Sequence, residues 1–191
     1  MRLLLIIGPP AVGKMTVGRA VAERSSYRLF HNHHTIELLL DVFDYGTPEF
    51  RTLNSEFRRR VMEEAASSGA DLIFTFVWGM DTASEADYLE RLVASYDGHI
   101  AVVELVAGLE TRLARNRTEH RLAEKKSKRD VDWSDANVLE LEAEHRMTSS
   151  PGLDAPAERL LARWPHLVID NTDLEPGEVA ERILAWLVTQ Q

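Results

Sequence analysis

The sequence predicts an α/β protein with an open parallel β-sheet that is covered by helices on both faces. Short apolar runs alternate along the 191 residues with longer segments of helical period. The clearest runs are continuously apolar, which is typical of parallel strands buried on both faces. This alternation indicates βαβ units joined by right-handed crossovers.

Five segments are expected as strands and four longer segments as helices. The strands are expected at residues 3–7, 72–78, 100–106 and 167–170, with a weaker candidate at 27–30. The helices are expected at residues 13–25, 48–68 and 84–95 and after Pro176, because apolar residues recur there at intervals of three or four. No repeat or linker divides the chain, so we expect one domain over residues 1–191.

The composition excludes several classes of protein. Apolar residues make up 45% and charged residues 28%, which indicates a folded globular domain rather than a disordered chain. The net charge of −9 argues against binding to extended nucleic acid or to a membrane surface. The absence of cysteine excludes disulfides and thiolate chemistry, and the apolar run at residues 3–7 is too short for a signal peptide. We therefore expect a soluble cytoplasmic protein, monomeric or homodimeric.

The strongest motif lies between the first strand and the first helix. Residues 8–16 read GPPAVGKMT, which has the glycine, four residues, glycine, lysine spacing of a phosphate-binding loop. The glycines permit a tight turn that directs N–H groups toward an anion, and the following helix adds the positive end of its dipole. Lys14 is expected to reach the β- and γ-phosphates and to act in catalysis. The residues expected to bind nucleotide here are Gly8, Pro9, Pro10, Ala11, Val12, Gly13, Lys14, Met15 and Thr16.

One position departs from the usual motif. The residue after the lysine is normally a serine or threonine that ligates Mg²⁺, but Met15 stands there and Thr16 follows. Because Mg²⁺ requires hard oxygen ligands, Met15 cannot ligate it. Thr16 is the candidate metal ligand. Either Thr16 contacts a phosphate while water and phosphate oxygens hold the ion, or metal binding is weak.

The motif GPPAVGKMT followed by VGRAVAE resembles the phosphate loop of the small P-loop kinases, such as adenylate, shikimate and gluconate kinases and chloramphenicol phosphotransferase. Together with FHNHHT and LARNRTEHRLAEKKSKRD, it is similar to bacterial proteins known as AAA-family ATPases or shikimate-kinase-like proteins. The resemblance implies a three-layer P-loop NTPase fold, a five-stranded parallel sheet of order 2-3-1-4-5 and a helical lid. It also implies ATP and Mg²⁺ as cofactors.

Kinases of this group carry a catalytic aspartate just after the second strand, but the matching stretch FHNHHT contains no carboxylate. A histidine is expected to take the proton of the substrate hydroxyl instead, with His33 as first choice and His31 as second. Asn32 is expected to hydrogen-bond the substrate. The alternatives are the carboxylates of Glu37 and Asp41, metal binding by the histidines, and a plain polar loop in which Thr35 caps the next helix.

The third expected strand lacks the aspartate that usually ends it. Trp78 at the end of that strand and Asp81 just beyond it are expected at the carboxyl edge of the sheet, where open α/β sheets bind ligands, and both are candidate substrate contacts. Trp78 is equally compatible with the core, and Asp81 with a helix cap. Further along, Asn171 and Thr172 follow the last strand, where the resemblance implies contact with adenine; a simple turn explains them equally well.

A basic segment opposes the acidic balance of the chain. Arg112, Arg115 and Arg117 precede a run of lysines and arginines that ends near residue 130. By position this segment matches the lid of the kinase group, expected at about residues 109–133. Arg115 and Arg117 are expected to stabilise charge in the transition state. The alternative is a solvated charged helix.

These observations predict a kinase that transfers the γ-phosphate of ATP to a small-molecule acceptor. Arginines on the helix expected at residues 48–68 are candidates for recognising an anionic acceptor, or a solvated face: Arg51, Arg58, Arg59 and Arg60. One alternative is a regulatory module that binds and hydrolyses ATP without a small-molecule acceptor. A second is a nucleic-acid end kinase or a toxin-type sugar-nucleotide kinase.

Overall fold

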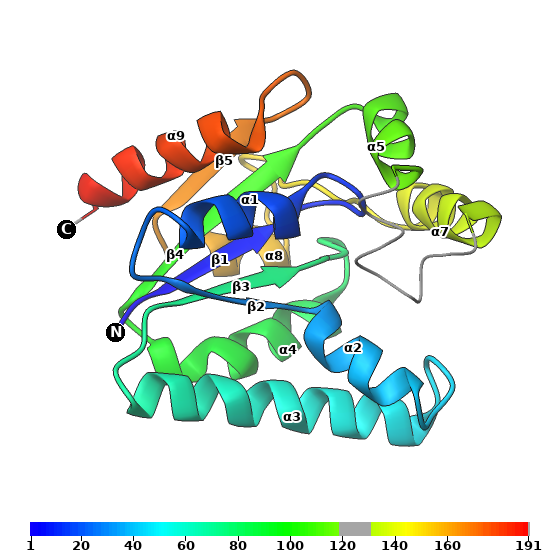
Figure 1. Ribbon diagram of the computed structural model, residues 1–191, viewed down its shortest axis with the longest axis horizontal. Coiled ribbons are helices and arrows are strands. Elements are labelled where there is room, and N and C mark those ends of the chain that lie inside the picture. The colour runs from blue at the N-terminus through cyan, green and yellow to red at the C-terminus, as the bar shows by residue number, and fades with distance from the viewer. Residues whose placement is uncertain (119–130, 191) are drawn as a thin grey trace.

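The computed structural model describes residues 1–118 and 131–190 (Figure 1). Five parallel strands form one sheet in the order β2-β3-β1-β4-β5. The predicted fold class and strand order are therefore confirmed. The strands are β1 (Leu3–Ile7), β2 (Arg28–His31), β3 (Leu72–Phe76), β4 (Ile100–Val106) and β5 (His166–Asp170).

Helices cover both faces of the sheet, and Figure 1 shows one layer above and one below. α1 (Lys14–Ala22) packs beside α9 (Pro176–Val188) on one face. α3 (Pro48–Ser67), α4 (Ala83–Val93) and α8 (Pro156–Leu161) cover the other face. The three layers follow from β1, in which Leu4 and Ile6 face α1 and α9 while their neighbours along the strand face the opposite core.

The start of α2 (His33–Leu40) differs from the prediction. One alternative had Thr35 capping this helix, but Asn32 occupies the N-cap position and Thr35 lies fully buried in the first turn. The Thr35 hydroxyl is used in a tertiary contact, since it donates to Asn54 Oδ1 at 2.5 Å. Other boundaries shift by a few residues: β3 ends at Phe76, and a short 3₁₀ turn (Ala94–Tyr96) follows α4.

Two helices, α5 (Leu109–Asn116) and α7 (Val131–Glu144), lie beyond the carboxyl edge of the sheet. Arg112 of α5 is buried and forms an ion pair with Glu142 of α7, N–O 2.6 Å. Asn116 Nδ2 also donates to Asp135 Oδ1 at 2.6 Å. Of the lid expected at residues 109–133, α5 and the start of α7 are described, whereas residues 119–130 lie outside the described residues. No helix among the described residues is long and apolar enough to cross a membrane.

A buried carboxylate holds the segment after α7 against the sheet. Glu104 of β4 is fully buried and accepts a 2.7 Å hydrogen bond from the Ser149 N–H. The Nε2 atom of His166 lies 3.1 Å from the other oxygen of this carboxylate. Burial alone would raise the pKa of the Glu104 carboxyl, but hydrogen bonds from His166 and Ser149 hold it below its usual value.

We expect Glu104→Gln to lower the free energy of unfolding by about 2 kcal/mol near neutral pH, because a buried, hydrogen-bonded charge is replaced. A carboxyl whose pKa is lowered by folding stabilises the protein above its unfolded pKa, and this contribution is lost as pH falls through the folded pKa. The difference from wild type should therefore shrink below about pH 4. Urea unfolding of both proteins near neutral pH and below about pH 4 measures this difference in the free energy of unfolding. An equal loss in exposed Glu56→Gln, or a difference independent of pH, would contradict the assignment.

Candidate functional site

The turn between β1 and α1 has the backbone geometry of an anion-binding loop. Gly8, Ala11 and Gly13 have φ angles of 137°, 61° and 104°, and Ala11 is the one non-glycine with positive φ among the described residues. No described side chain caps α1, and its first turn carries no acidic residue. Its first amides therefore remain available to an anion.

The Lys14 side chain lies over this turn. Its Nζ donates to the carbonyl oxygens of Gly8 at 2.6 Å and Pro9 at 2.7 Å, although the residue is only 8% exposed. These bonds hold a cation beside the inward-facing amides. An anionic phosphate chain matches this arrangement of charge.

Two other segments fix the turn from outside. Asn171, which follows β5, is buried and donates from Nδ2 to the Val12 carbonyl at 2.9 Å. Arg115 of α5 donates to the same carbonyl at 3.2 Å and to the Asn171 carbonyl at 2.7 Å. In this structure Arg115 therefore connects α5, the turn and the chain after β5.

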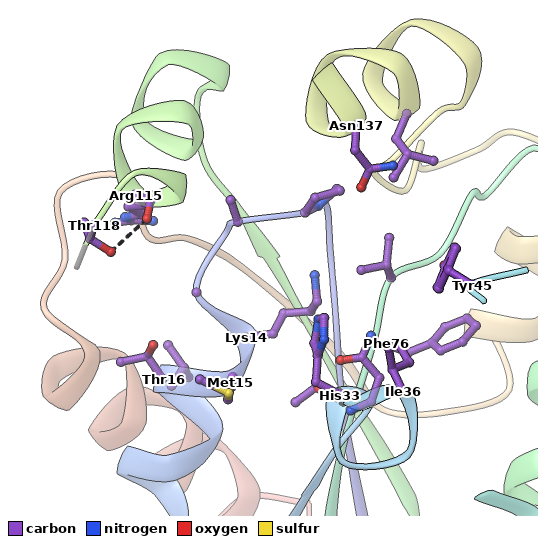
Figure 2. A pocket seen from close by; sticks show the side chains of 18 of the residues that line it. Lys14, Met15, Thr16, His33, Ile36, Tyr45, Phe76, Arg115, Thr118 and Asn137 are labelled. Atoms are coloured by element: carbon purple, nitrogen blue, oxygen red, sulfur yellow. Dashed lines mark hydrogen bonds between the residues drawn. The ribbon is translucent and has the colours of Figure 1, made fainter. Parts of the chain in front are cut away.

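A cavity of about 1430 Å³ opens beside the turn. Figure 2 shows Lys14 between its two ends. The loop end is lined by Met15, Thr16, Arg115 and Thr118. The α2 end is lined by His33, Ile36, Tyr45 and Phe76. The cavity is large enough for two ligands that meet near Lys14, since drug-sized ligands occupy pockets of roughly 300–1,000 Å³.

His33 and Asn32 reach the α2 end from the start of α2. The Nδ1 atom of His33 lies 3.5 Å from Glu37 Oε1, one helical turn later. This contact directs Nδ1 of the ring toward the Glu37 carboxylate. Asn32 donates from its backbone N–H to Thr75 Oγ1 on β3 at 3.3 Å, which ties α2 to the sheet.

Arg58 of α3 brings a guanidinium to the same end, and it is only 6% exposed. Its Nε donates to Thr35 Oγ1 at 3.0 Å and one NH₂ group donates to the Asn32 carbonyl at 3.0 Å. The guanidinium carbon Cζ of Arg58 lies 6.0 Å from the centre of the Phe74 ring. No described carboxylate forms an ion pair with it. A buried cation without a counter-charge is costly unless a ligand supplies one.

Several expected site residues lie away from the cavity, and Trp78 is the clearest correction. Trp78 lies two residues beyond the end of β3 at Phe76, and it is fully buried in the core that also contains Phe74 and Phe76. Asp81 is exposed and lies 3.3 Å from His145, and Thr82 rather than Asp81 occupies the N-cap of α4.

His31, Arg117 and Thr172 do not line the cavity either. His31 lies on β2 with its ring 3.6 Å from that of His34, whose pKa is lowered by burial and by the charge of Arg19. Arg117 is paired with Asp135 at 2.7 Å. Thr172 donates to Asp170 Oδ1 at 2.7 Å, within its own turn.

Glu85 lines the cavity without having been predicted. The pattern Thr82-x-x-Glu85 is that of a capping box, so it marked the start of α4 rather than a site. The carboxylate instead accepts from the Gly79 N–H at 2.7 Å. Burial raises the pKa of Glu85, partly offset by the Gly79 N–H and by His145.

The described residues fit a magnesium ion brought by a nucleotide better than a resident metal. They contain no group of three or more histidine or acidic side chains arranged to hold a metal, so the metal-site alternative for the histidines has no support. Thr16 offers a hydroxyl at the loop end, whereas Met15 is buried and has no oxygen to offer. Mg²⁺ commonly keeps waters and phosphate oxygens as most of its ligands.

No protein-family model and no curated protein matches the sequence. Several solved structures match over nearly their whole length. A Janibacter sugar kinase has a TM-score of 0.61 at 17% identity, covering 98% of this chain and 94% of its own. Shikimate kinase from Acinetobacter baumannii, in complex with shikimate, has a TM-score of 0.57 at 17% identity, and the match covers 100% of this chain and 95% of that one. A Sinorhizobium meliloti gluconokinase has a TM-score of 0.56 at 16% identity, and the match covers 99% of this chain and 93% of that one.

At this level of identity the likeness establishes the fold. The chain has the P-loop fold found in shikimate kinase, gluconokinase and sugar kinase structures, as the resemblance of its phosphate loop implied. The roles of individual residues remain proposals.

We expect Gly8→Ala to cost about 3 kcal/mol of stability, because an added Cβ would lie 2.3 Å from the Leu105 carbonyl oxygen and φ is 137°. Gly69→Ala is the matched control: its φ is also positive, at 75°, but no described atom lies within 4 Å of the new Cβ. The control should cost only about 1 kcal/mol. Urea unfolding compares them, and equal losses would show that the close approach to β4 is unimportant.

Proposed function

We propose that the protein is an ATP-dependent kinase that phosphorylates a hydroxyl group of a small-molecule acceptor. The observation that carries this proposal is a single cavity that joins the phosphate loop to the α2 end, with Lys14 between them. The kinase folds of the structural neighbours support it. A cytoplasmic location, where ATP is available, is part of the proposal.

ATP would lie with its phosphates in the turn at residues 8–13, against the first amides of α1. Lys14 would neutralise charge on the β- and γ-phosphates. Asn171 and Arg115 would keep the turn in its binding shape through the Val12 carbonyl. Mg²⁺ bound with the nucleotide would neutralise phosphate charge, with Thr16 as its protein ligand.

The acceptor would occupy the α2 end. Its hydroxyl oxygen forms a bond to the γ-phosphorus while the bond to the β–γ bridging oxygen breaks, and ADP leaves with that oxygen. The hydroxyl proton passes to Nε2 of His33, because Nδ1 is directed to Glu37. Since phosphoryl transfer demands little of a base, His33 contributes mainly by orienting the hydroxyl. Arg58 supplies a positive charge to a carboxylate or phosphate of the acceptor.

A module that hydrolyses ATP without an acceptor is the second candidate. Met15 in the metal-ligand position of the motif favours it, because weaker metal binding slows transfer. A screen of hydroxylated metabolites for transfer of labelled γ-phosphate separates the two. Transfer to at least one compound supports the kinase, whereas phosphate release that no compound stimulates supports the module. Transfer of the labelled phosphate to the ends of oligonucleotides, and to none of the metabolites, would favour the nucleic-acid end kinase.

We expect Lys14→Ala to abolish the rise in melting temperature that ATP produces in wild type, because the main cation of the loop is lost. Stabilisation by ligand follows the ratio of its concentration to its dissociation constant, so a large loss of affinity removes the shift. A thermal-shift titration with ATP measures it, and exposed Arg91→Ala is the control. An undiminished shift in Lys14→Ala would place the nucleotide elsewhere.

We expect His33→Ala to lower kcat by about tenfold to a hundredfold and to leave ATP affinity unchanged, because His33 contacts the acceptor only. His99→Ala, an exposed histidine before β4, is the control. Steady-state transfer and ATP thermal shifts give both quantities. Wild-type kcat in His33→Ala would move the acceptor hydroxyl away from α2.

A further inference from the structure

The α2 end of the cavity has an apolar wall. It is formed by α2, by the chain that joins α2 to α3, by α3 itself and by the end of β3. Its members are Ile36, Leu40, Tyr45, Phe50 and Phe76. Nothing in phosphoryl transfer requires apolar side chains at this place, so the wall points to the acceptor itself.

Tyr45 is the exposed part of this wall and is nevertheless held in place. Its side chain is 66% exposed, yet its ring lies 5.1 Å from that of Phe50, which is only 3% exposed. Phe50 is fixed in turn, because its N–H donates to the Thr47 hydroxyl at the start of α3. An exposed aromatic ring on a rigid support is typical of ligand-contacting positions, since little side-chain entropy remains to be lost.

A second exposed ring approaches the cavity from another element. Trp133 of α7 is 46% exposed and lines the cavity. Figure 2 shows α7 carrying Asn137 toward the cavity from above, while Tyr45 lies at the side. Two exposed aromatic residues from separate parts of the fold therefore line the same cavity.

Three polar side chains near the wall are bonded to each other or to backbone. Thr35 donates to Asn54 and accepts from Arg58, which also donates to the Asn32 carbonyl. A polyol at this end would need many unused partners for its hydroxyls. The described carboxylates that face the cavity from α4 and α7 are Glu85, Glu140 and Glu144, and they can accept from only part of such a molecule.

We propose that the acceptor carries an apolar ring of about phenyl size next to its reactive hydroxyl, and that Tyr45 and Trp133 border this ring. The inference rests on the proposed kinase function and narrows its substrate class. The hydroxyl lies toward His33 and Lys14, and the ring lies against the apolar wall. Simple polyols and short hydroxy acids lack the group that the wall contacts.

Two matched pairs of probes test the inference. Each pair shares the hydroxyls and differs by a ring: 3-phenoxypropane-1,2-diol with 3-methoxypropane-1,2-diol, and phenyllactate with lactate. Affinity is measured by ligand-observed NMR with a non-hydrolysable ATP analogue present, and transfer is measured with labelled ATP. Because burial of a phenyl ring is favourable, the ring-bearing compound of each pair should bind with about tenfold or more higher affinity.

The variants are Tyr45→Ala and Trp133→Ala, with Phe57→Ala as matched control. Phe57 is an aromatic residue of α3 that is as exposed as Trp133, at 46%, but it does not line the cavity. Each cavity variant should reduce the preference for the ring at least about threefold, raise KM for the ring-bearing acceptor and leave the ATP affinity unchanged. The control should keep the full preference.

Each outcome bears on one of the two proposals. Equal affinity within both pairs, or a preference that survives when Tyr45→Ala and Trp133→Ala are combined in one protein, overturns the ring-bearing acceptor, and transfer to any other compound would still support the kinase. A ring preference that the cavity variants reduce supports the inference. If that preference occurs while no compound in the wider metabolite screen accepts phosphate, the ring site stands and the kinase proposal fails.

Discussion

The close approach of the phosphate loop to β4 is the constraint on which the site depends. Gly8 lies so near the Leu105 carbonyl that any side chain would collide with it. This contact turns the chain sharply after β1 and brings the Val12 carbonyl within reach of Asn171 and Arg115. Three segments that leave neighbouring parallel strands are thereby joined around one turn. The conformation of this turn thus depends on the whole sheet edge rather than on the motif alone.

The opposite end of the cavity is built on a different principle. There the fold keeps Arg58 buried without a described carboxylate partner, and it holds the guanidinium with a carbonyl, a hydroxyl and the face of Phe74. Such an arrangement lowers stability compared with an apolar residue at the same place. Local choices that oppose stability are expected where a ligand completes the interaction, and this one lies in the same cavity as Lys14.

The sequence predicted the sheet well because its strands are continuous apolar runs, and the loop well because its spacing is rare. It predicted the start of α2 poorly. Thr35 has the chemistry of an N-cap, but a tertiary bond to Asn54 uses its hydroxyl, and the sequence holds no signal for that pairing. Trp78 was expected at the end of a strand over residues 72–78 and as a candidate substrate contact. The strand ends at Phe76 instead, and the Trp78 ring lies in the core with Phe74 and Phe76.

Arg58 illustrates why the α2 end was harder to predict than the loop end. Four arginines of α3 were equally good candidates in the sequence, and Arg59 and Arg60 prove to form surface ion pairs with glutamates of the same helix. Only the rotation of α3 on the sheet decides which of them is buried, and that rotation is fixed by apolar contacts such as Met62 with the core. The phosphate loop would contact a ligand through its own backbone, whose local geometry a short motif can specify. The α2 end is assembled from α2, α3 and β3, so its arrangement depends on packing between these elements rather than on any one segment.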